Sequence, residues 1–96
     1  MYILIFTKTF EQSYKIIIKN NKELEKRTQK ALKLLQQDPF YPSLKAHRVD
    51  TKKHGQKWSS WITGDLRIIW DFDEQKKLTI FLLAIGSHSG SHKEYK

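Results

Sequence analysis

Polar and apolar residues alternate along most of the second half of the chain, from Trp58 to Ile85. In a β-strand, successive side chains point to opposite faces, so a period of two gives one apolar face and one mixed face. Breaks near Gly64 and over residues 73–76 predict three antiparallel strands joined by short hairpins. The predicted core face consists of the even positions: Trp58, Ser60, Ile62, Leu66, Ile68, Trp70, Phe72, Leu78, Ile80, Leu82 and Ala84.

One strand and two helices are predicted before this segment. Residues 1–7 are β-branched and aromatic at odd and even positions alike, which suits a strand covered on both faces. Apolar residues recur at helical spacing over 9–18 and again from residue 20 until Pro39 ends the second helix. Residues 43–55 are interpreted as a connecting stretch. The sequence therefore predicts a single α+β domain over residues 1–96, with both helices on one face of an antiparallel sheet.

The charge balance favours a polyanionic partner. Eighteen Lys and Arg against ten Asp and Glu give a net charge of +8 on 96 residues, which favours RNA, DNA or an acidic protein. The longest apolar run is far shorter than a bilayer requires, and no secretory leader pattern is present. The chain has no cysteine for a disulfide or a thiolate. We therefore expect a cytoplasmic protein that does not contact the membrane.

The two hairpins predict which side chains lie side by side across the sheet. One predicted row contains three residues: Trp61, Arg67 and Leu83. The next row contains Thr63, Asp65 and Ile85. We expect His88 just beyond the edge of the sheet at which Asp65 lies. Polar groups from separate segments would then converge at this edge.

Metal chemistry and nucleotide hydrolysis find little support in the sequence. The chain has four histidines: His47, His54, His88 and His92. None of them has the context of a zinc finger, and the chain lacks a phosphate-binding glycine loop and a serine nucleophile elbow. We therefore expect neither a bound metal nor a cofactor.

Metal-free cleavage of RNA matches the convergent polar residues better. Attack by a ribose 2′-hydroxyl on the adjacent phosphate needs a base, a cation for the developing charge and an acid for the leaving oxygen. The imidazoles of His47 and His88 suit proton transfer, Arg67 offers a guanidinium to the phosphate, and Asp65 can orient an imidazole or accept a proton. Each residue also has a structural interpretation, since Asp65 suits a turn and Arg67 suits the solvent side of a strand.

Six further residues are candidates for RNA binding. Five are cations of the connecting stretch and the strand after it: Lys45, Arg48, Lys52, Lys53 and Lys57. They could contact phosphates or simply form a solvated surface. The sixth, Trp61, could stack on a base or pack against Leu83 and lysine side chains.

Three segments resemble the RelE/ParE superfamily of toxins from bacterial toxin-antitoxin pairs, nearest its YafQ-like branch. They are Asp38-Pro-Phe-Tyr-Pro-Ser-Leu-Lys-Ala-His47, Trp58-Ser-Ser-Trp-Ile-Thr-Gly-Asp-Leu-Arg-Ile-Ile69 and Leu83-Ala-Ile-Gly-Ser-His88. Together they make the resemblance extend over essentially the whole chain, including the order of one strand, two helices and three strands.

The resemblance implies a ribosome-dependent mRNA endonuclease that needs no cofactor and contacts 16S rRNA. It also implies a cognate antitoxin that wraps the toxin with an acidic or amphipathic segment. His47, Asp65 and His88 match the family's active-site positions, and Arg67 matches an arginine thought to hold the scissile phosphate. Trp61 stands where YafQ-like toxins have another histidine.

Two alternatives remain open at this point. The same fold serves ParE-like inhibitors of DNA gyrase, which act through protein contacts and would not need His47, Asp65 and His88 together. A catalytically inactive toxin homologue that serves as an antitoxin-binding module is the other alternative.

Overall fold

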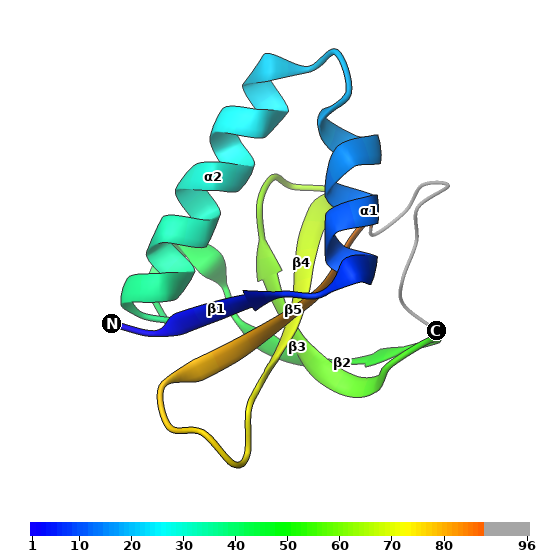
Figure 1. Ribbon diagram of the computed structural model, residues 1–96. Helices are drawn as coiled ribbons and strands as arrows, with labels where there is room; N and C mark the ends of the chain where they lie inside the picture. Colours follow the sequence, from blue (N-terminus) through cyan, green and yellow to red (C-terminus); the bar gives the residue numbers. More distant parts are fainter. Residues whose placement is uncertain (88–96) are drawn as a thin grey trace.

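The computed structural model describes residues 1–87 of the chain as an α+β fold (Figure 1). Its elements are β1 (Ile3–Phe6), α1 (Lys8–Ile18), α2 (Lys22–Gln37), the short 3₁₀ helix η1 (Pro42–Leu44), β2 (His47–Thr51), β3 (Gly55–Trp61), β4 (Leu66–Phe72) and β5 (Thr79–Ser87). The strands form one sheet in the order β1-β5-β4-β3-β2, and α1 and α2 lie on the same side of it. The predicted fold class is therefore confirmed.

The sheet is mixed, whereas the sequence predicted an antiparallel one. β1 runs parallel to β5, with Ile3 opposite Thr79, and the other three strand pairs are antiparallel. The Thr7 hydroxyl reinforces this pairing because it donates to the Leu82 carbonyl at 2.7 Å. Alternation of side chains does not encode strand direction, so only the path of the helices places β1 beside the last strand.

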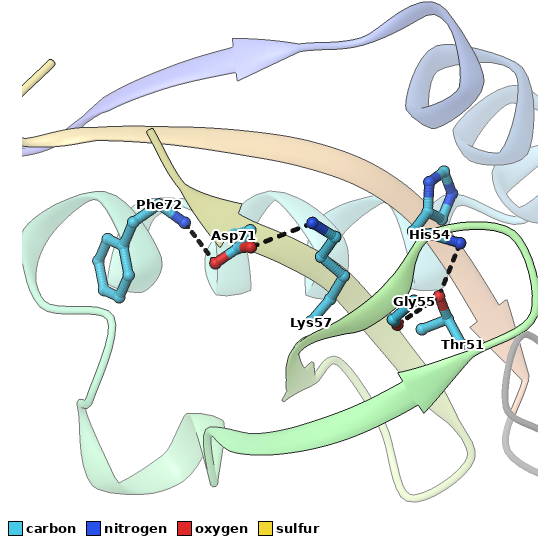
Figure 2. Close-up of polar contacts among 6 residues, drawn as sticks. All are labelled: Thr51, His54, Gly55, Lys57, Asp71 and Phe72. Carbon is cyan, nitrogen blue, oxygen red and sulfur yellow. Dashed lines mark hydrogen bonds and ion pairs between the residues drawn. The ribbon is translucent and has the colours of Figure 1, made fainter. Parts of the chain in front are cut away.

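A strand and a 3₁₀ helix occupy the stretch of 43–55 that was interpreted as a connection. β2 pairs antiparallel with β3, with His47 opposite Ser59 and Thr51 opposite Gly55. Figure 2 shows the turn that joins them: the Thr51 hydroxyl accepts from the His54 amide and donates to the Gly55 carbonyl, both at 2.9 Å. β2 is an edge strand with few apolar residues, so backbone pairing supports it and periodicity did not reveal it.

Each helix begins at a polar side-chain cap, Thr7 for α1 and Asn21 for α2, within two residues of the starts at 9 and 20 that the spacing predicted. The Thr7 hydroxyl accepts from the Phe10 amide at 3.2 Å at the start of α1, and Asn21 caps α2 in the same way. Such caps satisfy amides that have no partner within the helix. Within residues 1–87, no helix is long and apolar enough to cross a membrane.

The core lies between the two helices and the facing side of the sheet. It contains Phe10 and Leu35 from the helices and Ile68, Trp70 and Leu82 from the sheet, all at most 1% exposed. Full burial of one such side chain stabilises the fold by about 1.5–3 kcal/mol. The even-numbered residues of β3 and β4 therefore face the helices as predicted. Their odd-numbered residues lie on the opposite side, which we call the far face.

A β-bulge changes this parity in β5. Trp70 lies opposite Leu82, but Ile69 lies opposite Ala84, so one residue of β5 is skipped. Ile85 therefore joins the core beneath the helices, while Ala84 packs with Ile69 on the far face. The prediction that Ala84 faces the helices was wrong, because a bulge inserts one residue and reverses the alternation after it. Leu78 was also misplaced: it precedes β5 with a φ of 57° and is 55% exposed.

Candidate active site

The β3–β4 hairpin has the predicted register at its closed end. Trp61 lies opposite Arg67, so both side chains are on the far face. The third residue of this row is Gly86, not Leu83 as the sequence predicted, because the bulge and the longer β4–β5 turn shift β5. Leu83 packs against the cluster of Ile69 and Ala84 instead.

Arg67 is a buried cation held in one orientation. It is 5% exposed, and its Nη1 donates to the Thr63 carbonyl at 2.8 Å and to the Leu66 carbonyl at 3.2 Å. Its guanidinium carbon lies 4.3 Å from the centroid of the Trp61 ring. Within residues 1–87, Nε and Nη2 make no hydrogen bond, so they are the donors that could meet a phosphate. The solvent-side interpretation of Arg67 was therefore wrong.

Lys45 brings a second cation to Trp61. Its Nζ lies 4.0 Å from the ring centroid, and its backbone adopts the left-handed conformation with φ 48° and ψ 47°. By the strand order, Lys45 approaches from the β2 side of β3 and Arg67 from the β4 side. The indole therefore packs between two cations. Trp61 therefore contacts a lysine as predicted, together with Arg67 in place of Leu83, and its stacking on a base stays a prediction.

His47 presents a nitrogen that can accept a proton. Its side chain is exposed, and its Nδ1 lies 2.9 Å from the Lys45 carbonyl oxygen. A carbonyl oxygen can only accept, so Nδ1 carries the hydrogen and Nε2 is the basic nitrogen of the neutral ring. The pairing of His47 with Ser59 places it on the far face, one row from Trp61 and Arg67, or about 7 Å along the strand.

Asp65 lies at the turn between β3 and β4, beside the end of β5. It is exposed, and its Oδ2 accepts from the Ser87 hydroxyl at 2.7 Å. The sequence predicted that Ile85 and Asp65 share a row, and this was wrong. Ile85 lies opposite Ile68 in the core. The structure brings the end of β5 to Asp65 at Ser87, while His88 and His92 lie outside the described residues.

Three solved toxin structures share this fold. A metal-bound toxin from Helicobacter pylori is 28% identical with a TM-score of 0.71, and the match covers 93% of this chain and 97% of that one. The DinJ–YafQ complex from E. coli gives 14% identity, a TM-score of 0.69 and coverages of 93% and 96%. The YoeB–YefM complex from Staphylococcus aureus gives 19% identity, a TM-score of 0.65 and coverages of 88% and 94%.

The chain therefore has the fold of the RelE/ParE-type toxins, the superfamily that its sequence resembles. No protein-family model matches it, and neither does any of the curated proteins with which it was compared. The YafQ structure, at 14% identity, shares the fold of this chain, and the YafQ-like branch stays a prediction. In residues 1–87, no group of three or more His, Cys, Asp or Glu side chains is arranged to hold a metal ion.

The other candidate cations follow the β2 edge of the sheet. Arg48 lies opposite Trp58 with its guanidinium carbon 5.2 Å from that ring, on the helix side. Lys52 and Lys53 are exposed in the β2–β3 turn. Lys57 differs, because its Nζ forms an ion pair with the Asp71 carboxylate at 3.2 Å (Figure 2). The edge is therefore basic, but the charge of Lys57 is already neutralised.

A groove beside Trp61 was not foreseen from the sequence. It lies between α2, η1 and the end of β3 and has a volume of about 410 Å³. Its α2 residues include Glu23, Arg27 and Lys30, all of which are exposed. The spacing of Glu23 and Arg27 by four residues indicates an ion pair on one helix face, but no local signal places that face opposite η1.

Proposed function

We propose that this chain is the toxin of a toxin-antitoxin system and cleaves mRNA on the ribosome without a metal ion. The single observation that supports this most strongly is the oriented guanidinium of Arg67 on the same face as Nε2 of His47. A fixed cation and a proton acceptor near one another are what phosphate attack by a 2′-hydroxyl needs.

The proposed reaction gives each residue a separate task. The 2′-oxygen attacks the adjacent phosphorus while its proton passes to a base, and the 5′-oxygen leaves with a proton from an acid. His88 is the candidate for one of these proton transfers, and Asp65 orients it or shares its role. His47 assists at the phosphate or the leaving group. Arg67 stabilises the negative charge of the phosphorane, for which its buried and pre-oriented guanidinium is suited.

The partners follow from charge and from the relatives. The net charge of +8 favours both RNA and an acidic protein segment. YoeB and YafQ were solved in complex with YefM and DinJ, which supports a cognate antitoxin for this chain too. The exposed cations of the β2 edge, Arg48, Lys52 and Lys53, are suited to contacts with 16S rRNA. Such a target places the toxin in the cytoplasm.

Expression of the chain alone in bacteria tests this proposal. The 5′ ends of cellular mRNAs are mapped within minutes of induction, with and without an inhibitor of translation. We expect new ends inside codons that disappear when translation is blocked and when Arg67 is replaced by Ala. Growth arrest with intact mRNA would contradict the nuclease and favour gyrase or another protein target. Normal growth with folded toxin would favour an inactive antitoxin-binding module.

A further inference from the structure

The groove between α2, η1 and the end of β3 combines an apolar floor with a polar rim. Four of its apolar residues are Ala31, Leu34, Leu44 and Ile62. Two of these, Ala31 and Leu44, are at most 5% exposed, whereas the side chains of Arg27 and Glu23 are 56% and 69% exposed. The groove therefore offers buried apolar contacts at its base and exposed hydrogen-bonding groups at its rim.

We propose that this groove binds one base of the single-stranded RNA whose phosphate lies at Arg67, and that the Glu23–Arg27 pair contacts the hydrogen-bonding edge of that base. The inference rests on the proposed function, because it assumes an RNA ligand. It assigns base preference to α2, away from the residues that carry out the reaction.

The chemistry of the groove fits a nucleobase. A base has apolar faces and an edge that both donates and accepts hydrogen bonds. Arg27 Nε donates to Glu23 Oε1 at 3.1 Å, which holds the two side chains together and uses one donor and one acceptor oxygen. The second carboxylate oxygen and the remaining guanidinium N–H groups can pair with a base edge. The groove volume of about 410 Å³ lies within the range of small-ligand sites.

Trp61 makes the groove continuous with the candidate active site. The residue lines the groove and also contacts the Lys45 ammonium and the Arg67 guanidinium. An RNA strand with one phosphate at Arg67 can therefore place a neighbouring base in the groove on the other side of Trp61. Lys30, also in the lining, adds positive charge where the strand would enter.

Binding of short RNAs to the purified full-length chain tests this proposal. Fluorescence anisotropy measures the Kd for four labelled single-stranded hexamers, each of one base type. The wild type is expected to prefer some bases over others. Arg27→Ala should weaken the preferred RNA by about 10-fold, and Arg27→Ala and Glu23→Gln should both reduce the differences among the four RNAs.

Lys26→Ala is the matched control. It removes one positive charge from the same helix, and Lys26 does not line the groove. We expect it to weaken all four RNAs equally and only slightly. Ser43→Trp, which adds bulk from the exposed η1 side of the groove, should abolish the base preference while leaving the far-UV spectrum and thermal melting unchanged.

Three outcomes would overturn the base site. They are an unchanged order of the four RNAs in both Arg27→Ala and Glu23→Gln, an equal effect of Lys26→Ala and Arg27→Ala, or groove variants that weaken a protein partner but not RNA. The test is separate from that of the proposed function. Cellular mRNA that stays intact while the anisotropy pattern holds refutes the nuclease alone, whereas cleavage with an unaltered base preference in Arg27→Ala refutes the groove alone.

Discussion

The two ends of the β3–β4 hairpin each carry one cation, and the two cations have different partners. Lys57 at one end pairs with the carboxylate of Asp71 at 3.2 Å, which neutralises it. Arg67 at the other end is held by two carbonyl oxygens and an indole, and it forms no ion pair within residues 1–87. Carbonyl dipoles and an aromatic ring orient a cation without cancelling its charge. The hairpin therefore keeps a usable positive charge only at the end beside His47.

This comparison also explains why a basic composition is a poor guide to a site. Both residues are cations on the far face of the same two strands, and the sequence offered both as contacts of RNA, Arg67 at the scissile phosphate and Lys57 along the backbone. What separates them is the immediate neighbour: Asp71 across the strand from Lys57, and Trp61 across the strand from Arg67. Four predictions test this difference, from the largest expected effect to the smallest.

Arg67→Ala removes the oriented cation and should lower the rate of mRNA cleavage by about 100–1,000-fold, because the phosphorane loses its charge stabilisation. Arg67→Lys keeps a charge but loses the planar donors, so it should recover little of this rate. The rate is measured on mRNA in a reconstituted translation extract. Thermal melting checks that the variant is folded, because loss of the Arg67 hydrogen bonds to the Thr63 and Leu66 carbonyls should lower the free energy of unfolding by about 1–3 kcal/mol. A folded Arg67→Ala protein that cuts at the wild-type rate would refute this role.

His47→Ala removes the imidazole whose Nδ1 hydrogen is bonded to the Lys45 carbonyl and whose Nε2 is free to accept a proton. This substitution should lower cleavage by at least about 100-fold. The residue is exposed and contributes little packing, so stability should stay within about 0.5 kcal/mol of the wild type. The same extract assay measures the rate, and chemical denaturation measures stability. Unaltered cleavage would mean that proton transfer depends on other groups.

Trp61→Ala releases Lys45 and Arg67 from the ring between them and should lower cleavage by about 10-fold, since each cation–π contact contributes about 0.5–2 kcal/mol. Trp61→Phe keeps an aromatic ring and should lie between the two. The comparison is sharpened by measuring RNA affinity as well. If affinity falls as far as the rate in Trp61→Ala and recovers fully in Trp61→Phe, the ring stacks on a base and does not serve mainly to position the cations.

Asp71→Asn converts the Lys57 end of the hairpin into one more like the Arg67 end. The loss of a partly exposed ion pair should cost less than about 1 kcal/mol of unfolding free energy. The released ammonium should strengthen single-stranded RNA binding a few-fold at low salt and make it more salt-dependent. A double-mutant cycle with Lys57→Ala measures the coupling directly. No change in the salt dependence would show that RNA does not reach this end of the hairpin.

Much of the candidate site was predictable because it depends on a short hairpin. The spacing of Trp61 and Arg67 about Gly64 is local, so alternation and turn chemistry sufficed to pair them. The approach of the end of β5 to Asp65 also followed, although Ser87 replaces Ile85 there. The placement of Leu83 failed because a bulge in β5 leaves no trace in a pattern of apolar residues. Lys45 over Trp61 could not be foreseen, since it depends on η1 and on β2.

By itself, the sequence determined the two helices, the three strands after residue 55 and the apolar side that the helices cover, because helical spacing, alternation and turns are properties of neighbouring residues. Only the tertiary structure decided that β1 lies parallel to β5 and that β2 forms the other edge. The tertiary structure alone also brings Lys45 and Arg67 to the Trp61 ring and places α2 and η1 on either side of a groove. Each of these arrangements joins segments far apart in the chain, and their contacts exist only after the core has brought those segments together.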